Sequence, residues 1–329
     1  MDDLSQTPGS GAPVKRPEML AWEHQTLEKL VFAALQEQKA RRRWGIFFKL
    51  AVFVYLILVV VVLADFGGAG VPSEGNHTAL VQLNGTIEVK GEANAEKINS
   101  ALRNAFAEKS ALGVILRINS PGGSPVQSAI INDEIRRLRA QYPNKPLYVV
   151  VEDICASGGY YVAAAADKIY VNKASIVGSI GVLMDGFGFT GTMEKLGVER
   201  RMMTAGGDKG FLDPFSPENE KHKEHAQMLL KEIHQQFIDV VKAGRGKRLK
   251  EHPDMFSGLI WTGSQSIKLG LADDFGTVES VARDVIKAEK LLDYTVKENI
   301  AERFAKRLGA STMSGFWSGF AETFGIQVR

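Results

Sequence analysis

The stretch "PLYVVVEDICASGGYYVAAAADKIYVN", Pro146 to Asn172, decides the fold. It opens with branched and aromatic apolar residues typical of a buried strand, breaks at Ser-Gly-Gly, continues as an alanine-rich helix and ends in a second apolar run. A helix between two such strands is the usual crossover between parallel neighbours in one sheet. Ser157 stands at the turn between the first strand and the helix, which leaves two interpretations open: a nucleophile or a simple bend.

Strand-like and helix-like segments alternate on both sides of this stretch. Short branched runs occupy 78–87 and 112–120, whereas apolar residues recur with helical spacing in 95–110 and 126–142. A long charged helix is predicted further on, with Ser216 as its N-cap and a proline in its first position. We therefore predict an α/β domain with a largely parallel sheet covered by helices.

The composition of the chain is that of a globular protein. Its 329 residues are 45% hydrophobic and 24% charged, with a net charge of +2 and no basic face, so we expect no nucleic-acid partner. Cys155 is the single cysteine, which excludes an internal disulfide and a zinc site built on several thiolates. We expect neither a metal nor a cofactor.

One segment departs from this composition. The run "WGIFFKLAVFVYLILVVVVLA", Trp44 to Ala64, carries a single charge, Lys49, and matches the roughly 20 residues that cross a bilayer as a helix. The basic flank Arg41 to Arg43 marks the cytoplasmic side. A cleaved signal peptide is the alternative, but no A-x-A-like site follows, and a buried core helix would show an amphipathic face. We predict an uncleaved anchor, with the rest of the chain outside the cytoplasm.

The predicted anchor divides the chain into five parts. These are a cytoplasmic segment at 1–43, the anchor at 44–64, a linker at 65–76, a folded domain at 77–294 that contains Ser157, and a tail at 295–329. The tail is rich in aromatic residues, and two alternatives stay open for it: docking on a neighbouring subunit or the membrane, or partial order.

The first candidate nucleophile is Ser157. A serine followed by two glycines at the start of a helix exposes its hydroxyl and leaves the next N–H free to point at the same place. Cys155 is the competing nucleophile, but it lies on the apolar strand, where cysteine usually behaves as a small hydrophobic residue.

A serine hydroxyl needs a base, and the histidines do not supply one. None of the 6 histidines lies in a loop of small residues, and three of them share a charged helix: His222, His225 and His234. The pair His222 and His225 could face one ion, but its polar surroundings favour a solvated face. Lys209, in the Gly-rich loop "TAGGDKGFLDPFS", is the alternative base. A lysine amine accepts a proton near neutral pH only where its surroundings disfavour the charged form, as burial without a carboxylate does.

A second Gly-rich turn, "INSPGG" at Ile118 to Gly123, leaves a strand and precedes a helix. Its glycines allow backbone N–H groups to point into open space, as an oxyanion hole requires. A simple strand-to-helix turn is the alternative interpretation.

The segments "INSPGG", "ASGGYYVAAAADKIYVNKASIVGSIGV" and "AGGDKG", in this order and with these gaps, resemble the signal peptide peptidase A family of serine-lysine proteases. The likeness covers residues 79–288, and the single domain behind an anchor resembles the short form of that family. The resemblance implies a fold of the Clp protease and crotonase type, built from repeated ββα units.

The resemblance also implies roles for individual residues. Ser157 matches the nucleophile, Lys209 the base and Ser179 a hydroxyl that orients the lysine. The implied oxyanion donors are backbone N–H groups, those of Gly158 and Gly123, with Gly122 as the alternative.

The resemblance further implies partners and location. We expect a membrane-anchored endopeptidase on the periplasmic side of a bacterial inner membrane, held in the bilayer by 44–64 and degrading remnant signal peptides and other small or unfolded peptides. A homo-oligomeric ring is implied, with an octamer as one candidate size and the dyad shared between adjacent subunits. The alternatives are a peptidase of the same type that acts on membrane proteins, a crotonase-like acyl-CoA enzyme and a non-catalytic scaffold.

Overall fold

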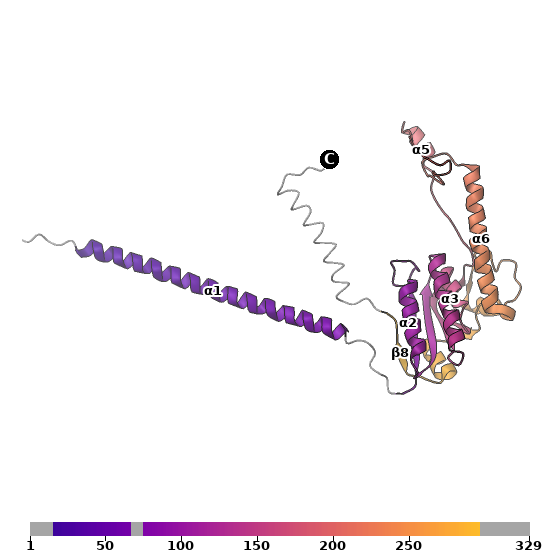
Figure 1. Ribbon diagram of the computed structural model, residues 1–329, viewed down its shortest axis with the longest axis horizontal. Coiled ribbons are helices and arrows are strands. Elements are labelled where there is room, and N and C mark those ends of the chain that lie inside the picture. Colours follow the sequence, from indigo (N-terminus) through magenta and orange to yellow (C-terminus); the bar gives the residue numbers. More distant parts are fainter. Residues whose placement is uncertain (1–15, 67–74, 297–329) are drawn as a thin grey trace, which may run out of the picture. The chain divides into compact units, whose positions relative to one another are not determined.

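The computed structural model describes residues 16–66 and 75–296 (Figure 1). The chain divides into two units, Met1–Val71 with Glu298–Arg329, and Pro72–Lys297. Residues 1–15, most of the predicted linker and nearly all of the predicted tail lie outside the described residues, so those predictions stay untested.

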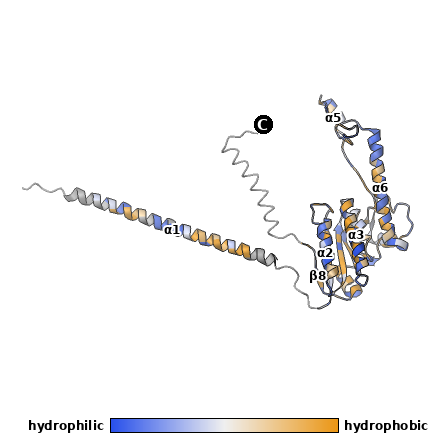
Figure 2. Cartoon of the chain, viewed as in Figure 1, coloured by the Kyte–Doolittle hydropathy of each residue, from blue (hydrophilic) through white to orange (hydrophobic). Residues whose placement is uncertain are grey.

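The described part of the first unit is one helix, α1 (Arg16–Phe66), of 51 residues. Figure 2 shows a mainly hydrophobic stretch in the second half of α1, before its grey end, and apolar side chains from Trp44 to Leu58 are exposed. Among the described residues, no helix combines the length and the apolar character that crossing a membrane requires. The predicted anchor at 44–64 is therefore not confirmed.

The second unit is built on an eight-stranded sheet with the order β6-β5-β3-β2-β1-β8, in which β4 also pairs with β3 and β7 pairs with β4. All these pairs are parallel except β5–β6. The prediction of an α/β domain with a largely parallel sheet is confirmed. The strands are β1 (His77–Asn84), β2 (Ala111–Ser120), β3 (Leu147–Ala156), β4 (Lys168–Val171), β5 (Ile176–Gly178), β6 (Ile260–Thr262), β7 (Asp274–Phe275) and β8 (Leu291–Asp293).

Alternate strand residues point to opposite faces of a sheet. In this sheet both sets of residues include buried apolar side chains, so helices cover both faces. On one face, Val81, Leu116 and Val149 pack in a core with α2 (Ala95–Ala107), α3 (Pro125–Gln141) and α4 (Gly158–Ala163). Figure 1 shows α2 and α3 over the sheet. On the other, Ile115 and Val150 pack in a second core with α8 (Val278–Ser280) and the π-helical turn η2 (Val281–Ile286). The remaining helices are α5 (Thr190–Lys195), α6 (Glu220–Arg245), η1 (Gly246–Arg248) and α7 (Gly263–Lys268).

The repeated ββα units implied by the resemblance are present only in reduced form. After β1 and after β2, the place of a second strand is taken by single residues, Ile87 and Gly123, which form an isolated parallel bridge. One helix follows each of them, α2 and α3. The bridge ties the two strand-to-helix turns together.

The long charged helix begins later than predicted. Its N-cap is Asn219, whose side chain accepts a hydrogen bond from the Lys221 N–H at 3.0 Å. Ser216 does not cap it, because the Ser216 hydroxyl donates to Asp213 at 2.6 Å instead. The segment 182–219, called the arm below, contains only the short α5 as regular structure and carries exposed apolar side chains such as Leu183, Phe187 and Met203.

Candidate active site

Ser157 occupies a strained turn between β3 and α4. Its backbone has φ 51° and ψ −124°, in the left-handed half of conformational space that non-glycine residues rarely enter. Its N–H donates to the Gly178 carbonyl at 2.8 Å, and its carbonyl accepts from the Tyr161 N–H at 3.0 Å, so β5 and α4 hold the turn. Such strain costs of order 1–3 kcal/mol and persists where the surroundings enforce it, which is typical of active sites.

The two glycines after Ser157 are required by close packing. A side chain at Gly158 would begin 2.4 Å from the Ser128 hydroxyl oxygen, and one at Gly159 would begin 3.0 Å from the Ser120 carbonyl oxygen. Both serines are fully buried, so neither can move aside cheaply. The Ser-Gly-Gly sequence thus lets α4 start directly against the end of β2 and the first turn of α3.

The Gly122–Gly123 turn lies against this same point. A side chain at Gly122 would begin 2.6 Å from the Gly158 nitrogen, and one at Gly158 would begin 3.2 Å from the Gly123 nitrogen. The two N–H groups of the turn differ: that of Gly122 is buried and donates to the Ser120 hydroxyl at 3.1 Å, whereas Gly123 is exposed. Gly123 is therefore the better placed of the two to donate to a ligand.

Ser179 also lies beside Ser157. It directly follows Gly178, whose carbonyl accepts the Ser157 N–H, and its own N–H donates to the Leu259 carbonyl at 2.8 Å. Like Ser157, it has a positive φ, 50°. The structure thus brings together Ser157, Ser179 and the three predicted glycines.

Lys209 does not join this group. Its side chain is exposed in a turn of the arm, its N–H donates to the Gly206 carbonyl at 3.2 Å, and no contact with Ser157 is present within the described residues. The neighbouring Asp208 fixes this turn to the start of α6, through the Lys221 ammonium at 2.6 Å and the His222 ring at 3.2 Å.

The length of α6 shows how far the turn that carries Lys209 lies from the region of Ser157. Further along it, the His234 ring nitrogen lies 3.1 Å from the carbonyl of Ile180, the residue after Ser179. From His222 to His234 the helix rises by about 18 Å, at 1.5 Å per residue. The lysine and the serine of one chain are therefore anchored at places several helical turns apart.

The predicted solvated face of the His222–His225 pair is wrong for His222, which is buried, whereas His225 is exposed. The His222 and His225 rings pack against Phe211, with ring centres 5.3 and 5.7 Å apart, and His222 is 9% exposed. Phe211 belongs to the turn that carries Lys209, so these rings anchor that turn. Sequence reasoning missed this contact because it joins a loop to a helix face.

Cys155 is fully buried, and burial raises the pKa of its thiol. The reactive thiolate is therefore disfavoured. The competing interpretation of Cys155 as the nucleophile has no support in the structure.

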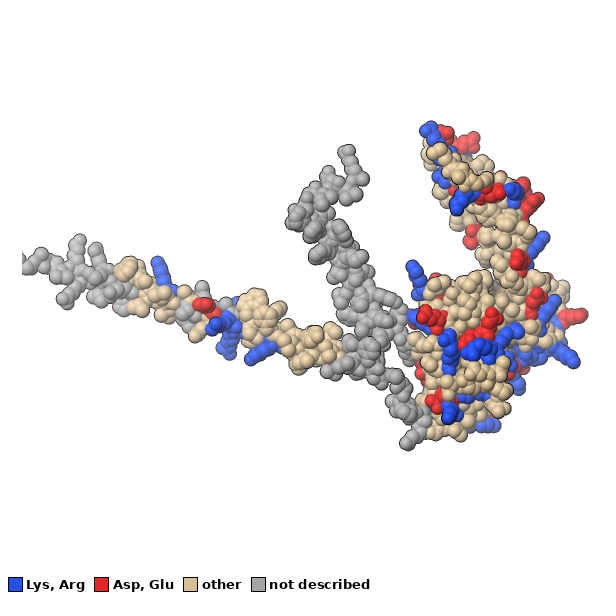
Figure 3. Space-filling model, in the orientation of Figure 1, with Lys and Arg blue, Asp and Glu red and all other residues tan. Residues whose placement is uncertain are grey.

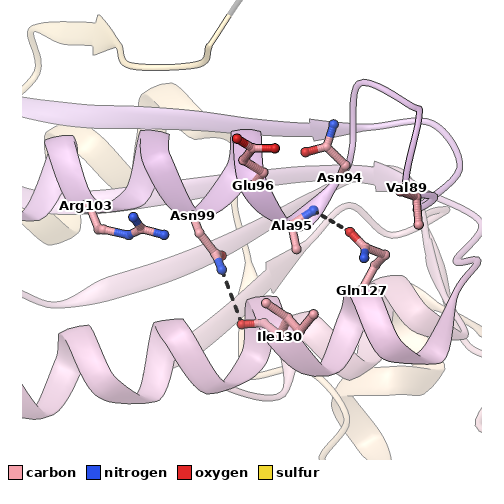
Figure 4. A pocket seen from close by; sticks show the side chains of 8 residues that line it. All are labelled: Val89, Asn94, Ala95, Glu96, Asn99, Arg103, Gln127 and Ile130. Carbon is pink, nitrogen blue, oxygen red and sulfur yellow. Dashed lines mark hydrogen bonds between the residues drawn. The ribbon is translucent and has the colours of Figure 1, made fainter.

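Among the hollows on the described domain, two lie beside its helices, and Ser157 lines neither of these two. One, of about 320 Å³, lies between the first turns of α2 and α3, where the Gln127 side chain accepts from the Ala95 N–H at 2.9 Å and the Asn99 side chain donates to the Ile130 carbonyl at 3.4 Å (Figure 4). The other, of about 720 Å³, lies between the arm and the first half of α6. Figure 3 shows acidic and basic side chains mixed over the visible face.

Comparison with known proteins gives one family match and several relatives. The model of peptidase family S49 matches residues 139–292. A putative signal peptide peptidase SppA of Enterococcus faecium is 32% identical over 226 residues, which are 66% of this chain and 65% of that protein. A putative protease, slr0021, of Synechocystis is 32% identical over 197 residues, 59% of this chain and 69% of that protein.

A third relative is a longer protein that is not named as a peptidase. The Na(+)/H(+) antiporter NhaA of Brucella melitensis is 46% identical over 209 residues, 62% of this chain but only 28% of that protein. The chain thus spans about a quarter of this relative and just under two thirds of the Enterococcus one. The family model and the 69% coverage of the Synechocystis protein agree on one assignment: the chain belongs to peptidase family S49.

Proposed function

We propose that the chain is a serine peptidase whose nucleophile is Ser157. The observation that carries the proposal is the backbone of this residue, held at φ 51° in a strand-to-helix turn beside two Gly-rich segments. This is the geometry of a nucleophile elbow, in which the turn lifts the hydroxyl out of the sheet.

In the proposed reaction, the Ser157 hydroxyl oxygen forms a bond to the carbonyl carbon of a peptide while neutral Lys209 takes the hydroxyl proton. The tetrahedral intermediate collapses as the peptide C–N bond breaks, and the lysine gives the proton to the leaving amine. Water, deprotonated by the same lysine, then hydrolyses the acyl-enzyme. Ser179 orients the lysine amine through its hydroxyl.

The oxyanion of the intermediate is stabilised, in this proposal, by the N–H groups of Gly158 and Gly123. The closeness of the two residues and the exposure of Gly123 support this pair. Gly122 is the weaker candidate, because its N–H already donates to the Ser120 hydroxyl. Removing one donor from such a pair typically costs about 10²–10³ in kcat.

We further propose that Lys209 acts on the Ser157 of a neighbouring copy. The support is the distance along α6 together with the exposed apolar side chains of the arm, which a second copy would cover. A ring of such head-to-tail contacts, such as an octamer, would complete every centre.

The substrates we propose are remnant signal peptides and other small or unfolded peptides at the outer face of a bacterial inner membrane. The relative named signal peptide peptidase and the exposed apolar side chains of α1 from Trp44 to Leu58 support this assignment. Residues 44–64 would hold the domain at the membrane in which such remnants lie.

Labelling with a fluorophosphonate or β-lactone probe tests the proposed nucleophile. We expect covalent labelling of the full chain at Ser157 and none of Ser157→Ala. A matched control is Ser264→Ala, since this serine is half-buried on α7, outside the candidate site, and its hydroxyl donates to the Lys173 carbonyl at 3.4 Å. Equal labelling of Ser157→Ala and the wild type would overturn the proposal, and an acyl-CoA enzyme or a scaffold would then be the better interpretation.

A further inference from the structure

The orientation of one peptide unit, between Gly122 and Gly123, decides whether the proposed oxyanion hole exists. Both residues have positive φ, 105° and 146°, so the turn lies in conformations open mainly to glycine. Glycine is also free to leave them, because it has many alternative conformations. Something besides the glycines must therefore hold the turn.

The carbonyl side of this peptide is fixed by Ile87. The Ile87 N–H donates to the Gly122 carbonyl at 2.8 Å, and the Ile87 carbonyl accepts the Ser124 N–H at 2.7 Å. In a planar trans peptide, the C=O and the N–H point in opposite directions. Since the Gly122 carbonyl points at Ile87, the Gly123 N–H points away from Ile87.

The preceding peptide is fixed by Ser120. This serine is the last residue of β2, is fully buried and accepts the Gly122 N–H with its hydroxyl oxygen at 3.1 Å. The Gly122 N–H is buried, so without this oxygen it would have no acceptor within the described chain. A buried N–H without a partner is unfavourable, and the turn would rotate to satisfy it.

We propose that Ser120 is a positioning residue of the peptidase: its hydroxyl, acting with the Ile87 bridge, holds the Gly122–Gly123 turn so that the Gly123 N–H faces the oxyanion. The inference rests on the proposed function, in which that N–H is a donor. Ser120 itself does not touch the substrate. Its effect reaches the reaction through one hydrogen bond to the backbone.

Kinetics of Ser120→Ala test the proposal. We expect kcat for a cleaved fluorogenic peptide to fall about tenfold to a hundredfold with KM unchanged, because the oxyanion forms only after binding. A peptide aldehyde, which forms a tetrahedral adduct on Ser157, should lose affinity by the same factor. Ser120→Cys keeps a weaker acceptor of similar size and should fall between Ser120→Ala and the wild type.

The matched control is Ser266→Ala, since Ser266 is also fully buried and its hydroxyl donates to the Gly263 carbonyl at 2.8 Å, on α7. It should lose stability without a selective loss of kcat. The inference is overturned if Ser120→Ala or Ser120→Cys keeps the wild-type kcat, or if Ser120→Ala lowers kcat no more than the control does. If the wild type itself neither cleaves the peptide nor reacts with the fluorophosphonate, the proposed function fails first, and the two failures are thus distinguished.

Discussion

The two residues of the proposed dyad lie in regions that differ in packing: Ser157 in a closely packed region and Lys209 in an exposed one. Around Ser157, buried strand ends and glycines are packed so closely that a single methyl group would collide with neighbouring backbone. The arm that carries Lys209 has glycines with open space around them and apolar side chains facing solvent, such as Met203 at 97% exposure. The first region is complete within one chain, whereas the second has a surface that another molecule can cover. Five predictions test this contrast, from the largest expected effect to the smallest.

Ser157→Ala and Lys209→Ala should each abolish peptide cleavage, because each removes one member of the proposed dyad. A mixture of the two inactive variants, refolded together, should recover activity, since intact Ser157 and intact Lys209 then meet across a contact between copies. Random equal mixing in a head-to-tail ring predicts about a quarter of the wild-type activity. Assay of the mixture against each variant alone checks this, and a mixture that stays inactive would place both groups in one chain.

Gly158→Ala should lower kcat by about a hundredfold or more, because its methyl group would begin 2.4 Å from the Ser128 hydroxyl and 3.2 Å from the Gly123 nitrogen. The matched control is Gly186→Ala in the arm, where no atom lies within 4 Å of the new methyl group. Steady-state kinetics of both variants measure the contrast. Similar kinetics for the two variants would contradict the prediction, because they would show that the turn at Gly158 accepts a methyl group without loss of activity.

Asp273→Asn should destabilise the packed region by about 3–5 kcal/mol, the usual cost of breaking a buried ion pair. The Asp273 carboxylate lies 2.8 Å from the Arg245 guanidinium, whose side chain is fully buried. Asp284→Asn is the control, because its pair with Arg283 is exposed. Urea unfolding should show a large loss for the first variant and no measurable change for the second.

The stability that Asp273 contributes should decrease as the pH falls. Burial alone would raise the pKa of this carboxyl, but the hydrogen bond and charge of Arg245, the Ile169 N–H and the Arg248 charge outweigh it and lower the pKa below its usual value. A lowered folded-state pKa gives stability that is present above the unfolded value of about 3.9 and is lost as the pH falls through the folded value. The difference in unfolding free energy between wild type and Asp273→Asn should therefore shrink at acid pH, and a constant difference would contradict the assignment.

Asp208→Asn in the arm should have the smallest effect. The hydrogen bonds from Lys221 and His222 lower the pKa of the exposed Asp208 carboxyl, and they anchor the turn of Lys209. Their loss should lower kcat by less than about fivefold, the range of exposed ion pairs, and leave the thermal midpoint unchanged. Glu199→Gln, which loses an exposed pair with Arg201 elsewhere in the arm, is the control. A large drop in the thermal midpoint would show that the arm is part of the packed core.

Much of the packed region could be predicted from local sequence. Branched runs identified the central strands, and the glycines after Ser157 and Pro121 marked the turns, because only glycine fits where backbone atoms approach so closely. The start of α6 is predicted too early, because Ser216 and Asn219 are both good capping residues. The Ser216 hydroxyl is taken up by a local hydrogen bond to Asp213, whereas the Asn219 side chain accepts the Lys221 N–H.

The contacts that hold the site together could not be predicted in this way. The Ser120 hydroxyl stands inside the quoted motif "INSPGG", yet its bond to Gly122 depends on how the chain turns after β2. The Ile87–Gly123 bridge joins two loops that follow different strands, and no local pattern reports such a pairing. The separation of Lys209 from Ser157 is set by the direction of α6, which spacing along the sequence does not encode.

The length of α6 between His222 and His234 affects how the proposed peptidase activity would be controlled in the cell. Under the proposed assembly, a newly made copy carries a prepared hydroxyl and an amine that cannot reach it, so it is a latent enzyme. Hydrolysis would then rise more steeply than in proportion to the amount of protein, and dilution would silence it without any inhibitor. The length of a helix would thus protect other proteins until enough copies have gathered in one place.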